Sequence, residues 1–213
     1  MLKRISFLCA FALCTTLGLP GALATPATEA FVQQNLDKAN MILTSSLSDA
    51  ERHARLRALL LGLAASRRIA MFTLGPYANG AAPAELDAFV EAFTNYSIAV
   101  YENALDQHKG QTLKVTGSSD RAADDSLVQT ELVNPNVSTA PPIRLAFRVR
   151  RGENGAPTVT DFQIEGVSFA SAQRADFTAY LQQHNASIPA LVRNLNALSD
   201  KLARQVETRS ARN

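Results

Sequence analysis

The sequence predicts an α+β fold, because the spacing of its apolar residues changes twice along the chain. Apolar residues recur every three or four positions up to about residue 108 and alternate with polar residues between about 112 and 164. The helical spacing then returns after about residue 177. Segregated helical and strand-rich stretches are typical of α+β domains. Without internal repeats or a long linker, we expect one domain with one sizeable core.

The first 24 residues have the layout of a secretory signal peptide. Lys3 and Arg4 precede an apolar run from Ile5 to Leu19, and small residues at Ala22 and Ala24 suit a cleavage site. The run is shorter than the roughly 20 residues that a membrane-spanning helix needs, although a retained anchor is the alternative. We therefore predict a signal peptide over residues 1–24 and a mature single domain over residues 25–213.

Composition excludes several classes of function. Cys9 and Cys14 both lie in the predicted signal peptide, so the mature chain has no disulfide, no thiol nucleophile and no thiolate metal site. Removal of Lys3 and Arg4 reduces the 21 basic residues to 19, which matches the 19 acidic residues. A mature chain with a net charge near zero has no general field to attract nucleic acid.

Two helices are predicted in the first half of the mature chain. Ser48 and Glu51 form a capping-box pattern in front of an apolar stripe. That stripe consists of Leu56, Leu59, Leu60 and Leu63. After the Gly75-Pro76 loop, a long amphipathic helix is expected from Pro83 to about His108.

Alternation with a period of two then predicts strands over about 112–116, 126–133, 143–150 and 158–164. Their short connections predict an antiparallel meander. We expect Gly166 to allow a bulge that bends the last strand. Two further helices are predicted around Phe177 and from Ser187 to Leu202.

Few residues offer catalytic chemistry. His53, His108 and His184 are scattered among polar residues, and the chain has no HExxH, GxSxG, P-loop or GxGxxG pattern. Three separated histidines without cysteine do not form a zinc-binding pattern. We therefore predict no catalytic residue, no metal and no cofactor.

Two pairs of carboxylates leave alternatives open. Asp161 and Glu165 share one face of a predicted strand, where they could act as acid and base. We prefer a structural role in which arginines such as Arg148 pair with them across the sheet. Asp124 and Asp125 could bind a cation, but we interpret them as part of a solvated turn.

Apolar and aromatic side chains point inward from both the predicted sheet and the long helix. A filled core and a ligand cavity produce the same periodicity, so the residues alone leave both interpretations open. If the interior is hollow, its predicted lining is Phe72, Phe89, Phe93, Tyr96, Val100, Leu113, Val115, Leu145, Phe147, Val149, Phe162 and Ile164.

Several motifs resemble one known family. They are Leu74-Gly75-Pro76-Tyr77, His108-Lys109-Gly110, Pro142-Ile143-Arg144-Leu145-Ala146-Phe147, Asp161-Phe162-Gln163-Ile164-Glu165-Gly166-Val167-Ser168 and Arg174-Ala175-Asp176-Phe177. Over residues 31–202 the chain resembles the MlaC, or toluene-tolerance, family of phospholipid-binding auxiliary proteins of ABC transporters in Gram-negative bacteria. The Asp161 to Ser168 segment is the most specific part of this likeness.

The resemblance implies a nuclear-transport-factor-2-like cone, in which a strongly curved antiparallel sheet and helices enclose an apolar pocket. It implies a monomeric periplasmic carrier for phospholipid, without a cofactor. The expected partners are an outer-membrane lipoprotein complex and an inner-membrane ABC transporter with an MCE-domain ring. Carriage of a hopanoid or another polycyclic lipid, an enzyme that uses Asp161 or Glu165 as a base, and a plain interaction module are the alternatives.

Exposed arginines could dock acidic partner surfaces. The candidates are Arg52, Arg55, Arg57, Arg67, Arg68 and the arginines on the outer face of the sheet. We prefer plain solvation as their role.

Overall fold

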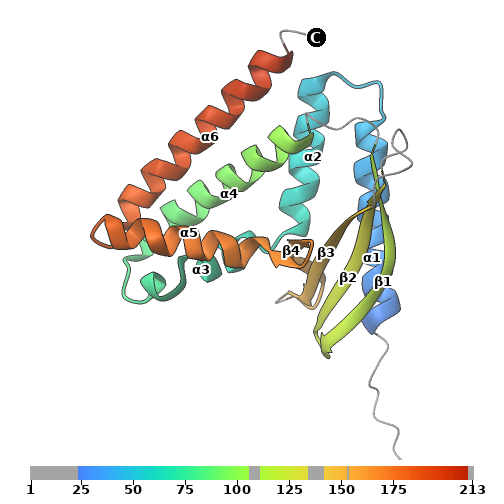
Figure 1. The fold of residues 1–213 in the computed structure, drawn as a ribbon, viewed down its shortest axis with the longest axis horizontal. Helices are drawn as coiled ribbons and strands as arrows, with labels where there is room; N and C mark the ends of the chain where they lie inside the picture. Colours follow the sequence, from blue (N-terminus) through green and yellow to red (C-terminus); the bar gives the residue numbers. More distant parts are fainter. Residues whose placement is uncertain (1–23, 106–110, 134–141, 153, 211–213) are drawn as a thin grey trace, which may run out of the picture.

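The computed structural model describes residues 24–105, 111–133, 142–152 and 154–210 (Figure 1). Within these ranges the chain forms α1 (Ala24–Leu43), α2 (Asp49–Leu63), α3 (Ser66–Leu74), the short 3-10 helix η1 (Gly75–Ala78), α4 (Pro83–Leu105), β1 (Thr112–Ala122), β2 (Asp125–Val133), β3 (Ile143–Arg151), β4 (Pro157–Ile164), β5 (Val167–Ser168), α5 (Phe169–Gln183) and α6 (Ile188–Ser210). The predicted α+β class is confirmed. The signal-peptide prediction lies almost wholly outside the described residues, as does His108.

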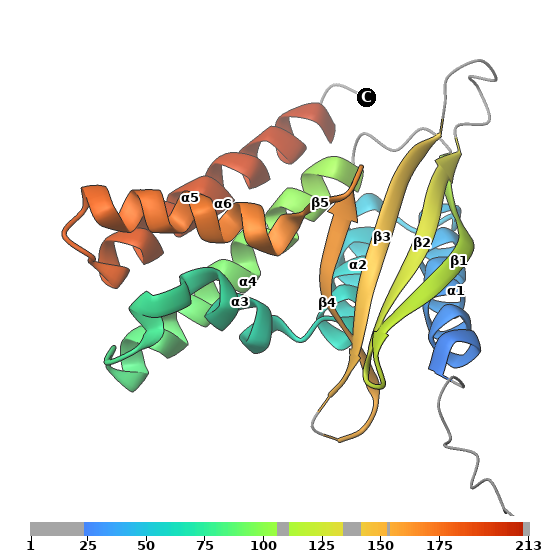
Figure 2. The same ribbon diagram turned by 60° about the horizontal axis from the view of Figure 1, so that its bottom comes forward.

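The sheet is an open antiparallel meander with the order β1-β2-β3-β4-β5. Each strand pairs with its neighbour in the chain, and the strands twist strongly (Figure 2). Helix α1 lies against β1 and β2, while α3 and α5 contact β4. None of the helices in the described ranges is long and apolar enough to cross a membrane.

The predicted capping box forms at the start of α2. The Glu51 amide donates to the Ser48 hydroxyl, and a Glu51 carboxylate oxygen accepts from the Ser48 amide at 3.1 Å. These reciprocal bonds satisfy two amide groups that the first helical turn would otherwise leave unpaired. Helix α2 therefore begins where the sequence predicts.

The prediction of a bulge at Gly166 is wrong. Glu165 and Gly166 connect β4 to β5 with φ angles of 48° and 82°. Two consecutive residues with positive φ are typical of a two-residue type I′ hairpin turn, and glycine is the residue least strained there. The register shifts of the sheet occur elsewhere, between Val115 and Gly117, between Asp120 and Ala122, and between Arg148 and Val149.

The apolar interior is divided into two clusters. The larger one is entirely helical and joins α3, α4, α5 and α6 around Phe89, which makes edge-to-face contact with Phe177 at 6.0 Å between ring centroids. The smaller one joins α1 to the sheet through Val32, Val128 and Val149.

Candidate functional site

One face of the sheet is apolar, and the strand register aligns its side chains in rows. Leu145 lies between Thr130 and Ile164, and Phe147 lies between Val128 and Phe162. Because successive side chains of a strand point to opposite faces, all these residues share the face on which α1 packs. The opposite face of the same strands carries Gln129, Arg144, Ala146 and Gln163.

Burial along the apolar face changes from one end of the strands to the other. Val128 and Val149 are buried under α1, whereas Leu145 and Phe162 are only half-buried. Towards the start of β3 and the end of β4 the exposed fraction rises to 47% at Ile143 and 48% at Ile164. A closed core would cover these large side chains, so this end of the face is open.

The helices on the same side of the sheet present half-buried apolar groups as well. Figures 1 and 2 show α2 between α4 and the sheet, on the side where α1 lies. Leu59, Leu60 and Leu63 of α2 and Val100 and Tyr101 of α4 are half-buried. Burial raises the pKa of the Tyr101 phenol, which stays neutral at physiological pH. The helices beside the sheet thus carry apolar side chains that the protein's own atoms cover incompletely.

The structure divides the predicted lining into three groups. Phe89 and Phe93 are 0% and 3% exposed inside the helical cluster, and Tyr96 packs against that cluster. Val115, Phe147 and Val149 belong to the cluster under α1. The residues that remain half-buried or exposed on the facing surfaces are Val100, Leu113, Leu145, Phe162 and Ile164.

Phe72 is a separate case, because its ring is 44% exposed on α3 beneath the Arg174 guanidinium. The α2 leucines and Tyr101 were missing from the predicted lining. Their helical spacing is visible in the sequence, but it does not reveal whether a stripe meets a helix or a sheet.

Asp161 is a structural carboxylate. It is 9% exposed and accepts hydrogen bonds from the Ser168 hydroxyl at 2.5 Å and the Ala170 amide at 3.0 Å. The Ser168 hydroxyl also accepts from the Ser171 amide and so caps α5. Asp161 therefore fixes the first turn of α5 to β4.

The sequence predicts Glu165 on a strand face, but the structure places it in the β4–β5 turn. Its carboxylate accepts from the Arg144 amide at 2.8 Å and from Arg144 Nε and Nη2 at 3.1 and 2.8 Å. The bond from the Arg144 amide and the bonds from its guanidinium hold the pKa of Glu165 below its ordinary value. These contacts stabilise the turn, in which Glu165 has a left-handed φ that is unfavourable for a residue with a side chain.

The prediction that an arginine of a neighbouring strand pairs with these carboxylates is confirmed for Glu165, whose partner is Arg144. It is wrong for Arg148, which pairs with neither Asp161 nor Glu165. Arg148 donates from Nε and Nη2 to the two carboxylate oxygens of Asp125 at 2.9 and 2.5 Å. Asp125 is 6% exposed rather than solvated, and Asp124 lies 3.5 Å from Arg150. In the described residues no group of three or more His, Cys, Asp or Glu side chains is placed to hold a metal ion.

Fold and site together define an α+β protein in which an open antiparallel sheet and the helices beside it carry half-buried apolar side chains. The sequence model of the MlaC protein family matches residues 33–197. The chain therefore belongs to the MlaC family.

A solved structure supports the same architecture. The phospholipid-binding protein from Ralstonia solanacearum, determined in complex with a phospholipid, superimposes with a TM-score of 0.69 at 21% sequence identity. The match covers 82% of this chain and 98% of that one. It establishes the shared fold.

Proposed function

We propose that this protein is a periplasmic carrier that holds the acyl chains of a phospholipid between the apolar face of the sheet and helices α2 and α4. The observation that carries the proposal is the contrast between the closed helical cluster and the half-buried residues facing one another across this space. Membership of the MlaC family and the phospholipid complex of the Ralstonia protein support the choice of ligand.

The proposed lining differs from the lining that the sequence predicts. It consists of Leu59, Leu60, Leu63, Val100, Tyr101, Leu113, Leu132, Leu145, Phe162 and Ile164. Phe89 and Phe93 are left out because their rings pack on Phe177 inside the helical cluster. A lining with one phenol and no charge suits hydrocarbon and tolerates variation in chain length.

Ile143, Ile164 and Val167 form the mouth of the space in this proposal. Their exposed fractions of 47%, 48% and 65% are high for large aliphatic side chains. Ile164 pairs with Val167 across the β4–β5 turn, and Ile143 begins the neighbouring strand. A lipid would enter here tails first and leave its headgroup at the strand ends.

The energetics explain why a carrier is needed. Each methylene transferred from water to an apolar site gains about 0.8 kcal/mol, so exposure of a 16-carbon chain costs about 12 kcal/mol. Free phospholipid therefore crosses water very slowly. A carrier that matches the apolarity of a bilayer removes this cost without holding the lipid too tightly to release it.

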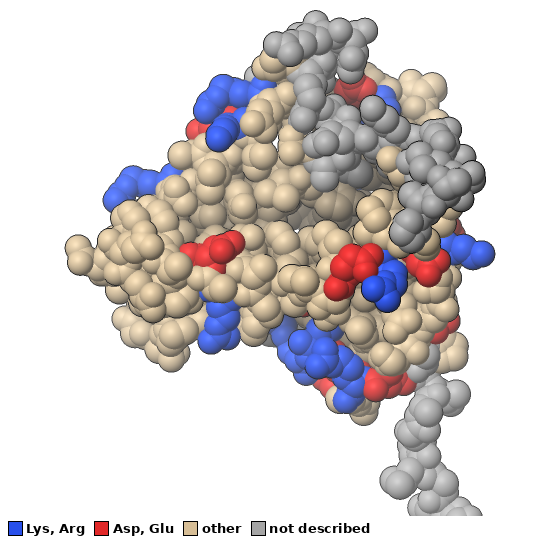
Figure 3. All heavy atoms as spheres, in the orientation of Figure 1, with Lys and Arg blue, Asp and Glu red and all other residues tan. Residues whose placement is uncertain are grey.

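The proposed route runs between an outer-membrane lipoprotein complex and an inner-membrane ABC transporter with an MCE-domain ring. The protein would act as a monomer and perform no bond-making step. Partner docking through arginines is not favoured, because two of the candidates already have local partners: Arg52 pairs with Asp49 and Arg67 with Asp87, each at 2.7 Å. On the described surface in Figure 3, basic and acidic side chains often lie next to one another.

The test is to purify the mature protein from cells, extract it with organic solvent and identify bound lipid by mass spectrometry. Phospholipid in near-stoichiometric amount is the expected result, and a Leu145→Asp variant should lose it. Met41→Asp is the control, because Met41 is 64% exposed on α1. If no lipid is recovered and labelled phospholipid also fails to bind, the proposal is wrong.

A further inference from the structure

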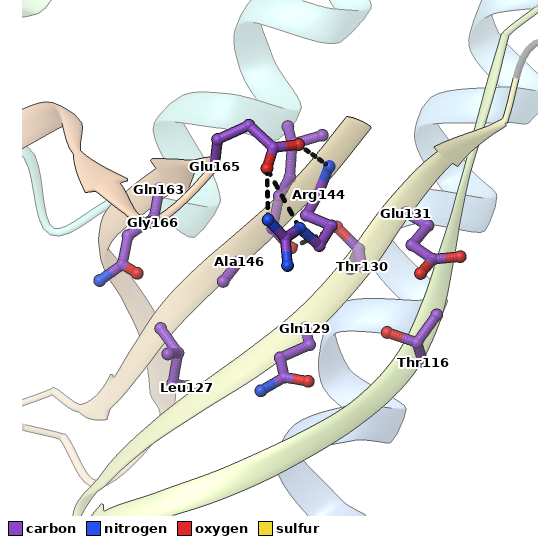
Figure 4. A pocket seen from close by; sticks show the side chains of 11 residues that line it. Thr116, Leu127, Gln129, Thr130, Glu131, Arg144, Ala146, Gln163, Glu165 and Gly166 are labelled. Carbon is purple, nitrogen blue, oxygen red and sulfur yellow. Dashed lines mark hydrogen bonds and ion pairs between the residues drawn. The ribbon is translucent and has the colours of Figure 1, made fainter. Parts of the chain in front are cut away.

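A second concavity lies on the opposite, outer face of the sheet. It has a volume of about 300 Å³ and is lined by side chains of β1, β2, β3 and β4 and by the β4–β5 turn. Figure 4 looks onto this face with the helices behind the strands. The pocket is therefore separated from the proposed lipid space by the thickness of the sheet.

The strand register arranges its lining in two rows. Glu131 lies opposite Arg144, which in turn holds Glu165. In the next row, Ala146 lies between Gln129 and Gln163. The small Ala146 side chain leaves the floor of the pocket open between two amide groups (Figure 4).

Only some polar groups of the pocket make hydrogen bonds within the protein. Glu165 occupies Nε and Nη2 of Arg144, which leaves Nη1 available. Among the described residues, the side chains of Thr116, Gln129, Glu131 and Gln163 have no hydrogen-bond partner. Two carboxylates and one guanidinium give the lining one net negative charge.

We propose that this pocket binds a small zwitterion in which a primary ammonium and a phosphate ester are separated by two carbons, as in phosphoethanolamine. The ammonium lies against the Glu131 carboxylate and the amide oxygens of Gln129 and Gln163. The phosphate accepts from Arg144 Nη1. Residues opposite each other on neighbouring strands have Cβ atoms about 5 Å apart, which suits the two charges of such a group.

Charge selects the zwitterion over a simple anion. A free phosphate at Arg144 would lie close to both Glu131 and Glu165, and like charges at short range repel. An ammonium in the same ligand removes that penalty through a charge-assisted hydrogen bond to Glu131.

The group can come from a lipid or from solution. Arg144 follows Ile143 and Glu165 follows Ile164 in the chain, so the pocket borders the proposed mouth of the lipid space. A headgroup left at the strand ends reaches the pocket from there. The lipid source rests on the proposed function, whereas binding of the soluble zwitterion does not.

The experiment titrates the 15N-labelled mature protein with glycerophosphoethanolamine, ethanolamine and inorganic phosphate, and follows the side-chain amide resonances of Gln129 and Gln163. We expect glycerophosphoethanolamine to shift both resonances and to bind about tenfold more tightly than either fragment. Glu131→Gln should weaken this binding by about tenfold, while Glu91→Gln, an exposed carboxylate on α4, should not.

Absence of any shift, equal binding of inorganic phosphate, or binding unaffected by Glu131→Gln would overturn the inference. Loading from phosphatidylethanolamine and phosphatidylglycerol vesicles distinguishes the sources. A loss of phosphatidylethanolamine alone in Glu131→Gln identifies the lipid headgroup. Unchanged loading of both lipids in a Glu131→Gln variant that has lost binding of the zwitterion identifies a soluble ligand. If the wild-type protein loads both lipids but does not bind the zwitterion, this inference is wrong and the proposed carrier function stands.

Discussion

The guanidinium of Arg174 lies over the ring of Phe72, with its Cζ atom 5.1 Å from the ring centroid. The contact joins α3 to α5, and the same side chain packs against Gly75 at the end of α3. Two motifs that are about 100 residues apart in the sequence thus form one structural unit. Both helices also contact β4.

Gly75→Ala should destabilise the protein by about 1–3 kcal/mol. Gly75 has φ +59°, and a Cβ atom there would lie 3.0 Å from Arg174 Nε. Gly62→Ala is the control, because nothing lies within 4 Å of the point that its Cβ atom would occupy and helical alanine is favoured by about 1 kcal/mol. Urea unfolding of both variants measures the difference, and equal stabilities would contradict the prediction.

Asp161→Ala should cost about 1–3 kcal/mol, because the Ala170 amide would lose a buried acceptor and the Ser168 hydroxyl would lose one of its acceptors. The exposed Asp200→Ala should change stability by less than about 0.5 kcal/mol. Hydrogen exchange should locate the loosening in the first turn of α5. If Asp161→Ala unfolds like the wild type, the anchoring role is refuted.

Asp125 should make stability depend on pH. The hydrogen bond from Arg148 holds the pKa of Asp125 below its ordinary value. A carboxyl group whose pKa is lower in the folded state stabilises the protein above its unfolded pKa of about 3.9, and this contribution disappears as pH falls through the folded value. Asp125→Asn should therefore be less stable than the wild type by about 2 kcal/mol at pH 7.

The two proteins should converge as pH decreases below about 4. Thermal unfolding between pH 7 and pH 3 measures the convergence. A difference that stays constant over this range would show that the ion pair with Arg148 does not produce the pH dependence.

The sequence predicts the elements well where a local rule decides. The Ser48–Glu51 pattern marks the start of α2, and alternation locates β2, β3 and β4. At Gly166 the local rule is ambiguous, because glycine is favoured both in a β-bulge and in a type I′ turn. The pairing of Ile164 with Val167 distinguishes the two, because it leaves a two-residue turn between the strands.

The lining was harder to predict because periodicity identifies an inward face but not its partner. Phe89 and Leu145 both occupy regular apolar positions, yet Phe89 packs among three other helices and Leu145 is left half-buried. The sequence also does not predict which charged side chains pair across the sheet. The register places Arg148 opposite Asp161, yet Arg148 pairs diagonally with Asp125 because Asp161 accepts hydrogen bonds from the start of α5 instead.

Truncation of Phe89 and of Leu145 should separate stability from lipid binding. Phe89 is fully buried between Phe93 and Phe177, so Phe89→Ala leaves a cavity and should cost about 3–5 kcal/mol. Leu145 is half-buried, so Leu145→Ala should cost less than about 1.5 kcal/mol in the lipid-free protein, because little covering contact is lost. Bound hydrocarbon, by contrast, covers Leu145 and leaves Phe89 untouched in the proposed complex.

Phospholipid should therefore raise the melting temperature of the Phe89→Ala variant as much as that of the wild type, and raise that of Leu145→Ala less. Differential scanning calorimetry with and without lipid measures both shifts. The opposite ranking, with Phe89→Ala losing the ligand-induced shift and Leu145→Ala keeping it, would move the acyl chains into the helical cluster and away from the sheet.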